Sequence, residues 1–301
     1  MIAVIALLSF ICIALPIGFA WRLWRLELPT RLGWLIVLAE TAVLVGLILL
    51  LGRWDIAGLW TRMALAALLV GAALVSAFRH LRRPWWEQDA LSVWRGHGLP
   101  LASLALFGAA LVYVTGWGGM ARHEPRALTF PLQGGWFVVA QGGGIGILNH
   151  HASHPAQRHA LDITAVDAAG FRAAGLLPED PARYAIFGKT VVSPCAGTAT
   201  AAVDGLPDLP PPTADRANPA GNHVVLACGE LQIELAHLRK GSVVVEVGRQ
   251  IAAGAAIGQV GNSGNSTEPH LHIHAVDQRS GAGVQMSFDG IVPIRNTFFA
   301  R

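Results

Sequence analysis

Four apolar stretches in the first 120 residues limit what this chain can fold into. They cover residues 2–20, 33–52, 59–78 and 100–119. Each approaches the roughly 20 residues that a helix needs to cross the hydrocarbon core of a bilayer. Buried helices of a globular protein are the alternative, but such helices keep a polar face at the helical period. Residues 41–51 are apolar all round, so we interpret the four stretches as membrane spans.

The composition supports a membrane region joined to a domain rich in turns. The chain of 301 residues is 53% hydrophobic and only 14% charged, whereas soluble domains carry about 25% charged residues. Its formal net charge of +3 does not indicate a nucleic-acid partner. Three cysteines are too few for a disulfide-built scaffold, and 34 glycines with 17 prolines argue against helices throughout.

The first stretch does not have the features of a cleaved signal peptide. No lysine or arginine precedes Trp21, and no clear small-x-small cleavage site follows. We therefore expect it to be retained as a span, which gives a four-span region over residues 1–120 and a second domain over residues 121–301.

The arginines near the span ends are distributed unevenly. Seven lie in the first and third connecting segments, namely Arg22, Arg25, Arg31, Arg79, Arg82, Arg83 and Arg95. Four lie in the second connecting segment, at the edge of the third span or after the fourth span, namely Arg53, Arg62, Arg122 and Arg126. Because positive residues accumulate on the cytoplasmic side, we expect a multi-pass protein of the inner or plasma membrane whose C-terminal domain is periplasmic or extracellular.

The pattern changes after residue 120. Short β-branched runs alternate with glycine-rich turns, at residues 136–140, 190–193, 223–227, 231–235 and 243–247. Short strands separated by turn signals predict an all-β domain. Ten of the 12 histidines also lie in this part of the chain. Histidine binds metals and exchanges protons near neutral pH, so this cluster indicates a metal site.

The most informative segment is Gly-Asn-Ser-Gly-Asn-Ser-Thr-Glu-Pro-His-Leu-His-Ile-His, residues 261–274. On a strand, residues two apart face the same side. His270 and His272 are therefore expected to project into one cleft, with His274 further along. Three histidines on a solvated strand face would be the alternative.

Two further segments carry candidate groups. His237 ends the strand-like run Ile-Glu-Leu-Ala-His, and Asp162 lies in Gln-Arg-His-Ala-Leu-Asp-Ile. Taken alone, the histidine is typical of an ordinary half-buried residue. An isolated aspartate beside a strand is usually a cap or turn residue.

Together these segments resemble the lysostaphin-type zinc metallopeptidases, β-sheet enzymes that cut peptide bonds in bacterial cell walls. The resemblance covers roughly residues 130 to 295 and leaves the four spans outside. Its specific part is an ordered series, namely Ala236-His237-Leu238, a glycine-rich stretch over residues 247–264, and Pro269-His270-Leu271-His272. It implies an antiparallel sheet built from a duplicated hybrid motif, with Zn²⁺ as the cofactor.

The resemblance also implies roles for individual residues. His272, as the second histidine of the His-x-His pair, and Asp162 match the zinc ligands of the family. His270 and His237 match its catalytic histidines.

The sequence departs from the family at the first zinc ligand. Arg158 occupies that position, and a guanidinium cannot bind a cation. His159 is adjacent, but on a regular strand it would face away from Asp162. A subgroup of the family has an Asn/His segment upstream of a similar run, so we expect His151 as the ligand, with His150 second and His159 third.

We therefore expect a membrane-anchored zinc metalloendopeptidase that hydrolyses peptide bonds, with peptidoglycan peptides as the substrate and the lipid bilayer as a partner. The alternative is a non-catalytic lysostaphin-like domain that binds cell wall or regulates a partner hydrolase, as Arg158 would allow. The sequence leaves open which bond is cut and the oligomeric state.

The cysteines allow one disulfide. Cys195 and Cys228 lie in strand-like segments of the second domain, whereas Cys12 lies in the first span. An oxidising compartment permits a bond between the first two. Two separate buried thiols are the alternative, and the sequence leaves both open.

Overall fold

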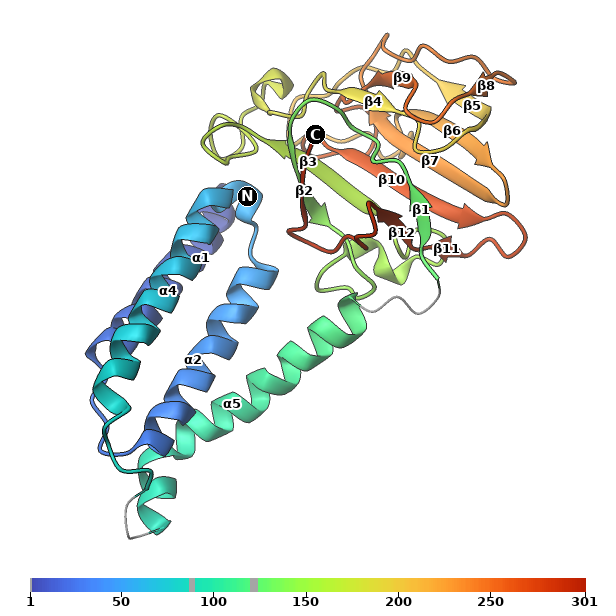
Figure 1. The fold of residues 1–301 in the computed structure, drawn as a ribbon. Helices are drawn as coiled ribbons and strands as arrows, with labels where there is room; N and C mark the ends of the chain where they lie inside the picture. Colours follow the sequence, from blue (N-terminus) through green and yellow to red (C-terminus); the bar gives the residue numbers. More distant parts are fainter. Residues whose placement is uncertain (1, 87–89, 120–123) are drawn as a thin grey trace. The chain divides into compact units, whose positions relative to one another are not determined.

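A computed structural model describes residues 2–86, 90–119 and 124–301. Met120, Arg122 and His123, and the side chain of Arg95, lie outside the described parts of the chain. The described chain forms two compact units, Ala3–Gly116 and Trp117–Arg301 (Figure 1).

The first unit is helical, as the sequence predicts. Its elements are α1 (Ile2–Arg25), α2 (Arg31–Leu51), the short α3 (Trp54–Ala57), α4 (Leu59–His80) and α5 (Ala90–Gly119). Within the described residues, four segments are long and apolar enough to cross a membrane, namely Ile2–Arg25, Arg31–Leu51, Leu59–His80 and Gly96–Gly118. These segments coincide with the four apolar stretches of the sequence.

A few polar side chains connect these helices. The carboxylate of Glu40 on α2 pairs with Arg22 on α1 at 2.8 Å. The indole of Trp34 on α2 donates to the Ser76 hydroxyl on α4 at 3.1 Å, and the same ring stacks on that of His80 on α4 with 5.7 Å between centroids. Polar groups inside a membrane need such partners, so these contacts fix α2 against its neighbours.

The second unit is built on β-strands, which confirms the expected fold class. Over residues 124–301, a nine-stranded sheet has the order β13-β2-β3-β10-β7-β6-β5-β8, with β11 also paired to β10. Its strands are β2 (Trp136–Gln141), β3 (Leu161–Val166), β5 (Gly197–Val203), β6 (Asn222–Cys228), β7 (Leu231–Leu238), β8 (Gln250–Ile251), β10 (Leu271–Asp277), β11 (Gly283–Val284) and β13 (Phe298–Ala300). All of the neighbouring pairs in this sheet are antiparallel.

Two small sheets complete this unit. In the first, β1 (Arg126–Leu128) pairs in parallel with β12 (Met286–Phe288). In the second, β4 (Thr190–Val192) pairs antiparallel with β9 (Ala256–Gln259).

Alternation along the central strands separates a core face from a polar face. Leu271 and Ile273 of β10 belong to the apolar core, as do Leu161 and Ile163 of β3. The residues between them therefore project from the opposite face. On β10 and β3 those residues include His272 and Asp162, so packing of the core sets the direction of both polar side chains.

The structure pairs Cys195 with Cys228 in a disulfide, which resolves the question that the sequence leaves open. Their Cα atoms are 6.2 Å apart, inside the limit of about 7 Å for such a bond. The bond joins the chain just before β5 to the end of β6. Closing a loop of this size contributes about 3–4 kcal/mol in the chain-entropy account of disulfide stabilisation. Cys12 is a free thiol.

Candidate metal centre

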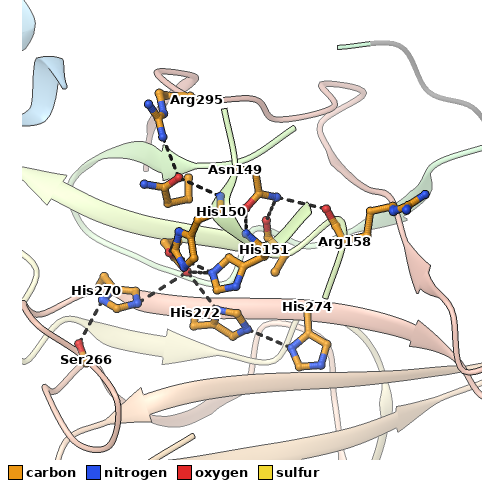
Figure 2. A network of polar contacts seen from close by, with 12 residues as sticks. Asn149, His150, His151, Arg158, Ser266, His270, His272, His274 and Arg295 are labelled. Atoms are coloured by element: carbon orange, nitrogen blue, oxygen red, sulfur yellow. Dashed lines mark hydrogen bonds and ion pairs between the residues drawn. The ribbon is translucent and has the colours of Figure 1, made fainter. Parts of the chain in front are cut away.

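The pairing of β3 with β10 brings a carboxylate and an imidazole together from opposite parts of the domain. In this antiparallel pair, Asp162 lies directly opposite His272. Directly opposed residues project to the same side, with side chains a few ångströms apart. The Nδ1 atom of His272 is 3.0 Å from Asp162 Oδ1 (Figure 2). Both side chains are buried.

A short 3₁₀ turn, His150–Ser153, supplies a second imidazole. Asn149 caps this turn, because its side-chain oxygen accepts the backbone N–H of His151 at 3.1 Å. The amide nitrogen of the fully buried Asn149 donates at 3.0 Å to the carbonyl of Ala160, which directly precedes β3. The turn is thereby tied to the strand that carries Asp162. His151 Nε2 lies 3.1 and 3.2 Å from the two carboxylate oxygens of Asp162.

Nitrogen atoms of His151 and His272 thus both lie against the carboxylate of Asp162. A tetrahedral zinc ion with bonds of about 2.0–2.2 Å separates its ligand atoms by about 3.3–3.6 Å. The distances of 3.0–3.2 Å from each imidazole to the carboxylate are close to that spacing. Two imidazoles and one carboxylate also form a donor set that is typical of catalytic zinc. By spacing and by chemistry, these residues fit the metal.

His150 lies at the edge of the same cluster. Its ring centroid is 3.8 Å from that of His151, and its Nδ1 is 3.9 Å from Asp162 Oδ2. Ligand atoms of His150, His151 and Asp162 all lie within 4.8 Å of one another, so these three could also hold an ion. The side chain of His150 is 61% exposed, however, against 15% for His151.

The remaining candidates near β3 take other positions. The Arg158 side chain is exposed and points away from the histidine cluster (Figure 2). The His159 ring lies beside Gly144, where a Cβ atom would be 3.9 Å from Cε1. The group of described residues that could hold an ion consists of His150, His151 and Asp162, so both His159 and His272 are outside it, but His272, unlike His159, contacts Asp162 directly.

His270 and His237 flank the cluster with similar hydrogen bonding. His270 Nδ1 donates to the Glu268 carbonyl at 2.8 Å, and His237 Nδ1 donates to the Ser263 carbonyl at 2.9 Å. Each neutral ring then keeps a lone pair at Nε2. His270 Nε2 is 3.6 Å from Asp162 Oδ1, and the two rings are 4.8 Å apart between centroids.

The position of His237 depends on an unusual backbone conformation. Ala236 lies directly opposite His272, so regular alternation would send the next side chain to the other face of the sheet. His237 has φ of +61°, and the pairing of β7 with β6 is irregular here, between Asn222 and Val224. This left-handed backbone breaks the alternation, and the ring lies 6.0 Å from that of His272 between centroids. Strained backbone of this kind is common at functional sites.

The charge states of these groups suit metal binding. Burial opposes ionisation of Asp162, but the charge of His270 and hydrogen bonds from His151 and His272 outweigh it and hold its pKa well below the usual range. Burial, followed by the neighbouring His270 and His272, lowers the pKa of His237 well below its usual range. Burial also lowers the pKa of His150. These shifts favour the ionised form of Asp162 and the neutral forms of His237 and His150, and ionised carboxylates and neutral imidazoles are the forms that bind metals.

Several supporting residues were not expected from the sequence. The buried Arg172 pairs with Glu268 at 2.7 Å, beside the carbonyl that holds His270. Ser263 acts through its backbone carbonyl, which no sequence motif reveals. The capping role of Asn149 could have been predicted from the sequence, because asparagine just before a helical turn is a favoured N-cap.

Comparison with known proteins gives one family match. Residues 184–284 match the model described as peptidase family M23. The matched segment includes His237, His270 and His272 but not His151 or Asp162. A search of curated proteins found no match.

Among solved structures, a zinc-containing peptidase from Vibrio cholerae is 18% identical, with a TM-score of 0.34 over 53% of this chain and 39% of that one. The catalytic domain of lysostaphin from Staphylococcus simulans is 25% identical, with a TM-score of 0.26 over 33% of this chain and 68% of that one. An NMR structure of lysostaphin is 24% identical, with a TM-score of 0.27 over 37% and 46%. The chain thus spans well under two thirds of the length of the Vibrio peptidase.

The β-strand unit carries a His/Asp group that could hold a metal ion. Over residues 184–284 it is similar to peptidase family M23, and it follows candidate membrane helices in the same chain.

The backbone at His237 gives a testable prediction. Replacing His237 by Gly or by Ala removes the ring in both cases, but only glycine tolerates positive φ without a steric cost. We expect the Gly variant of the full chain to be about 1 kcal/mol more stable than the Ala variant in denaturant unfolding. Ala236→Gly, one residue away, is the control and should destabilise. A more stable Ala variant at position 237 would contradict a left-handed backbone there.

Proposed function

We propose that the chain is a membrane-anchored zinc metalloendopeptidase that hydrolyses peptide bonds of peptidoglycan outside the cytoplasm. Residues 1–120 form the membrane region and residues 121–301 the peptidase domain. The observation that carries the proposal is that His151 and His272 both contact the buried carboxylate of Asp162, with the imidazoles of His237 and His270 nearby.

We assign the zinc ligands as His151, Asp162 and His272. His151 is preferred over His150 because its nitrogen is closer to the carboxylate and its ring is far less exposed. Three protein ligands leave one coordination position open for water or substrate, as in catalytic zinc sites generally.

Zinc, when bound, supplies a Lewis acid that activates water at neutral pH and polarises the scissile carbonyl. His270 and His237 are placed to transfer protons during hydrolysis. Because each ring donates from Nδ1 to a backbone carbonyl, each Nε2 can accept a proton from the attacking water and return it to the leaving amine. In protonated form the same atoms would donate to the developing oxyanion.

Arg158 at the position of the family's first zinc ligand would favour a non-catalytic domain. The Arg158 side chain points away from the cluster, and the upstream turn offers His151 instead (Figure 2). This arrangement supports catalysis over a purely binding role.

Two observations support a location outside the cytoplasm. Arginine is more frequent in the first and third connecting segments, which favours their placement on the cytoplasmic side. The Cys195–Cys228 disulfide is typical of proteins in oxidising compartments. Peptidoglycan, which lies outside the cytoplasm, is therefore the proposed substrate.

The ligand assignment predicts different effects for substitutions of His151 and of His237. In the full chain purified in detergent, His151→Ala should lose both bound zinc and peptide hydrolysis, because one of three protein ligands is gone. His237→Ala should keep zinc but lose roughly 10²–10⁴-fold in rate, the usual contribution of a general acid–base group. Metal content is measured by mass spectrometry, and hydrolysis with purified peptidoglycan.

His159→Ala is the matched control for His151→Ala and should leave zinc and hydrolysis largely intact. If His159→Ala loses zinc while His151→Ala keeps it, the ligand assignment is wrong. If the wild-type chain retains zinc but cleaves no peptidoglycan peptide, the proposed substrate is wrong.

The proposed orientation is tested by reporter fusions. A fusion after Arg83 should report a cytoplasmic location, and a fusion after Arg126 should report the opposite side, because one span separates them. A cytoplasmic signal from the Arg126 fusion would refute both the orientation and peptidoglycan as the substrate.

A further inference from the structure

The second ring nitrogen of His272 contacts another buried histidine. His274 Nδ1 lies 3.1 Å from His272 Nε2 (Figure 2), and the ring centroids are 5.2 Å apart. Both rings are buried. The two residues lie two apart on β10, and therefore on the same face of the sheet. Each ring nitrogen of His272 thus has its own partner, Asp162 at Nδ1 and His274 at Nε2.

Metal binding determines which nitrogen of each ring carries the proton. A neutral imidazole carries one N–H, and the other nitrogen has the lone pair. If His272 binds a metal through Nδ1, its proton must lie on Nε2. That N–H can then donate to His274 Nδ1, which requires the proton of His274 to lie on its own Nε2.

Without a metal, the opposite tautomers of His272 and His274 allow hydrogen bonds at the same two contacts, with Asp162 and between the two rings. The proton on His272 Nδ1 donates to Asp162 Oδ1, and the proton on His274 Nδ1 donates to His272 Nε2. Each ring carries one proton in both arrangements. Metal binding would therefore exchange the tautomers of both rings without a net gain or loss of protons.

We propose that His274 is a positioning residue that accepts the Nε2–H of His272 and so holds the lone pair of His272 Nδ1 toward the metal. This inference rests on the proposed zinc site and goes beyond it. Metal-bound histidines usually donate their other N–H to a carboxylate, a backbone carbonyl or water. In this chain, a second buried imidazole on the same strand takes that place.

The test compares two substitutions in the full-length protein. His274→Asn keeps an acceptor, because its Oδ1 can occupy roughly the position of the imidazole Nδ1. His274→Leu removes the acceptor but fills similar space. Loss of such a partner costs about 10–100-fold in metal affinity. Titration with zinc against a competing chelator should show this loss for His274→Leu and a much smaller one for His274→Asn.

A second measurement reports the tautomers directly. In ¹⁵N-histidine-labelled wild-type protein, the nitrogen chemical shifts of His272 and His274 should show Nδ1–H without zinc and Nε2–H with zinc. Assignment uses the single variants of each residue. This readout remains available if the leucine variant fails to fold.

The results separate this inference from the proposed function. The proposed role of His274 is wrong if His274→Leu binds zinc as tightly as the wild type. It is also wrong if His274→Asn binds zinc as weakly as His274→Leu. Neither result contradicts the zinc site itself. Tautomers of His272 and His274 that do not change on zinc loading would likewise show that the proposed role of His274 is wrong. A wild-type chain that binds no zinc overturns both proposals.

Discussion

The site depends on one cross-strand pair, Asp162 opposite His272. The register of β3 against β10 is fixed by the apolar residues on either side, because a slip of one residue would turn Leu271, Ile273 and their partners out of the core. The same packing that stabilises the sheet therefore places a carboxylate and an imidazole within 3.0 Å of each other. Burying an ionised carboxylate is costly unless it is well partnered, and four histidines lie within 4 Å of this one.

The other groups reach this pair through irregular backbone. His151 comes from a short turn that is held by the buried Asn149, and His237 comes from a left-handed residue at the end of β7. Regular strands supply only the alternate positions on one face, so a site with four or five converging groups needs such departures. Their conformational cost is offset by the surrounding hydrogen bonds, for example from His237 to Ser263.

Much of the fold and part of the site could be predicted from the sequence. Span length and apolar character were enough to predict four long helices, and strand parity predicted that His270 and His272 share one side. Parity could not place His237, because it assumes regular backbone. Nor could it choose between His150 and His151, since both lie in a 3₁₀ turn rather than on a strand. Arg172 and Ser263 support the site through long-range contacts that no local pattern encodes.

We propose that His151, Asp162 and His272 together bind one zinc ion, and X-ray absorption spectroscopy of the zinc-loaded full chain would show the ligands of that ion. We expect nitrogen and oxygen ligands at about 2.0–2.2 Å, with scattering from two imidazoles in the wild type and from one in His151→Ala reloaded at high zinc. An unchanged imidazole signal in His151→Ala, or loss of the signal in His159→Ala instead, would show that the ligand set is wrong.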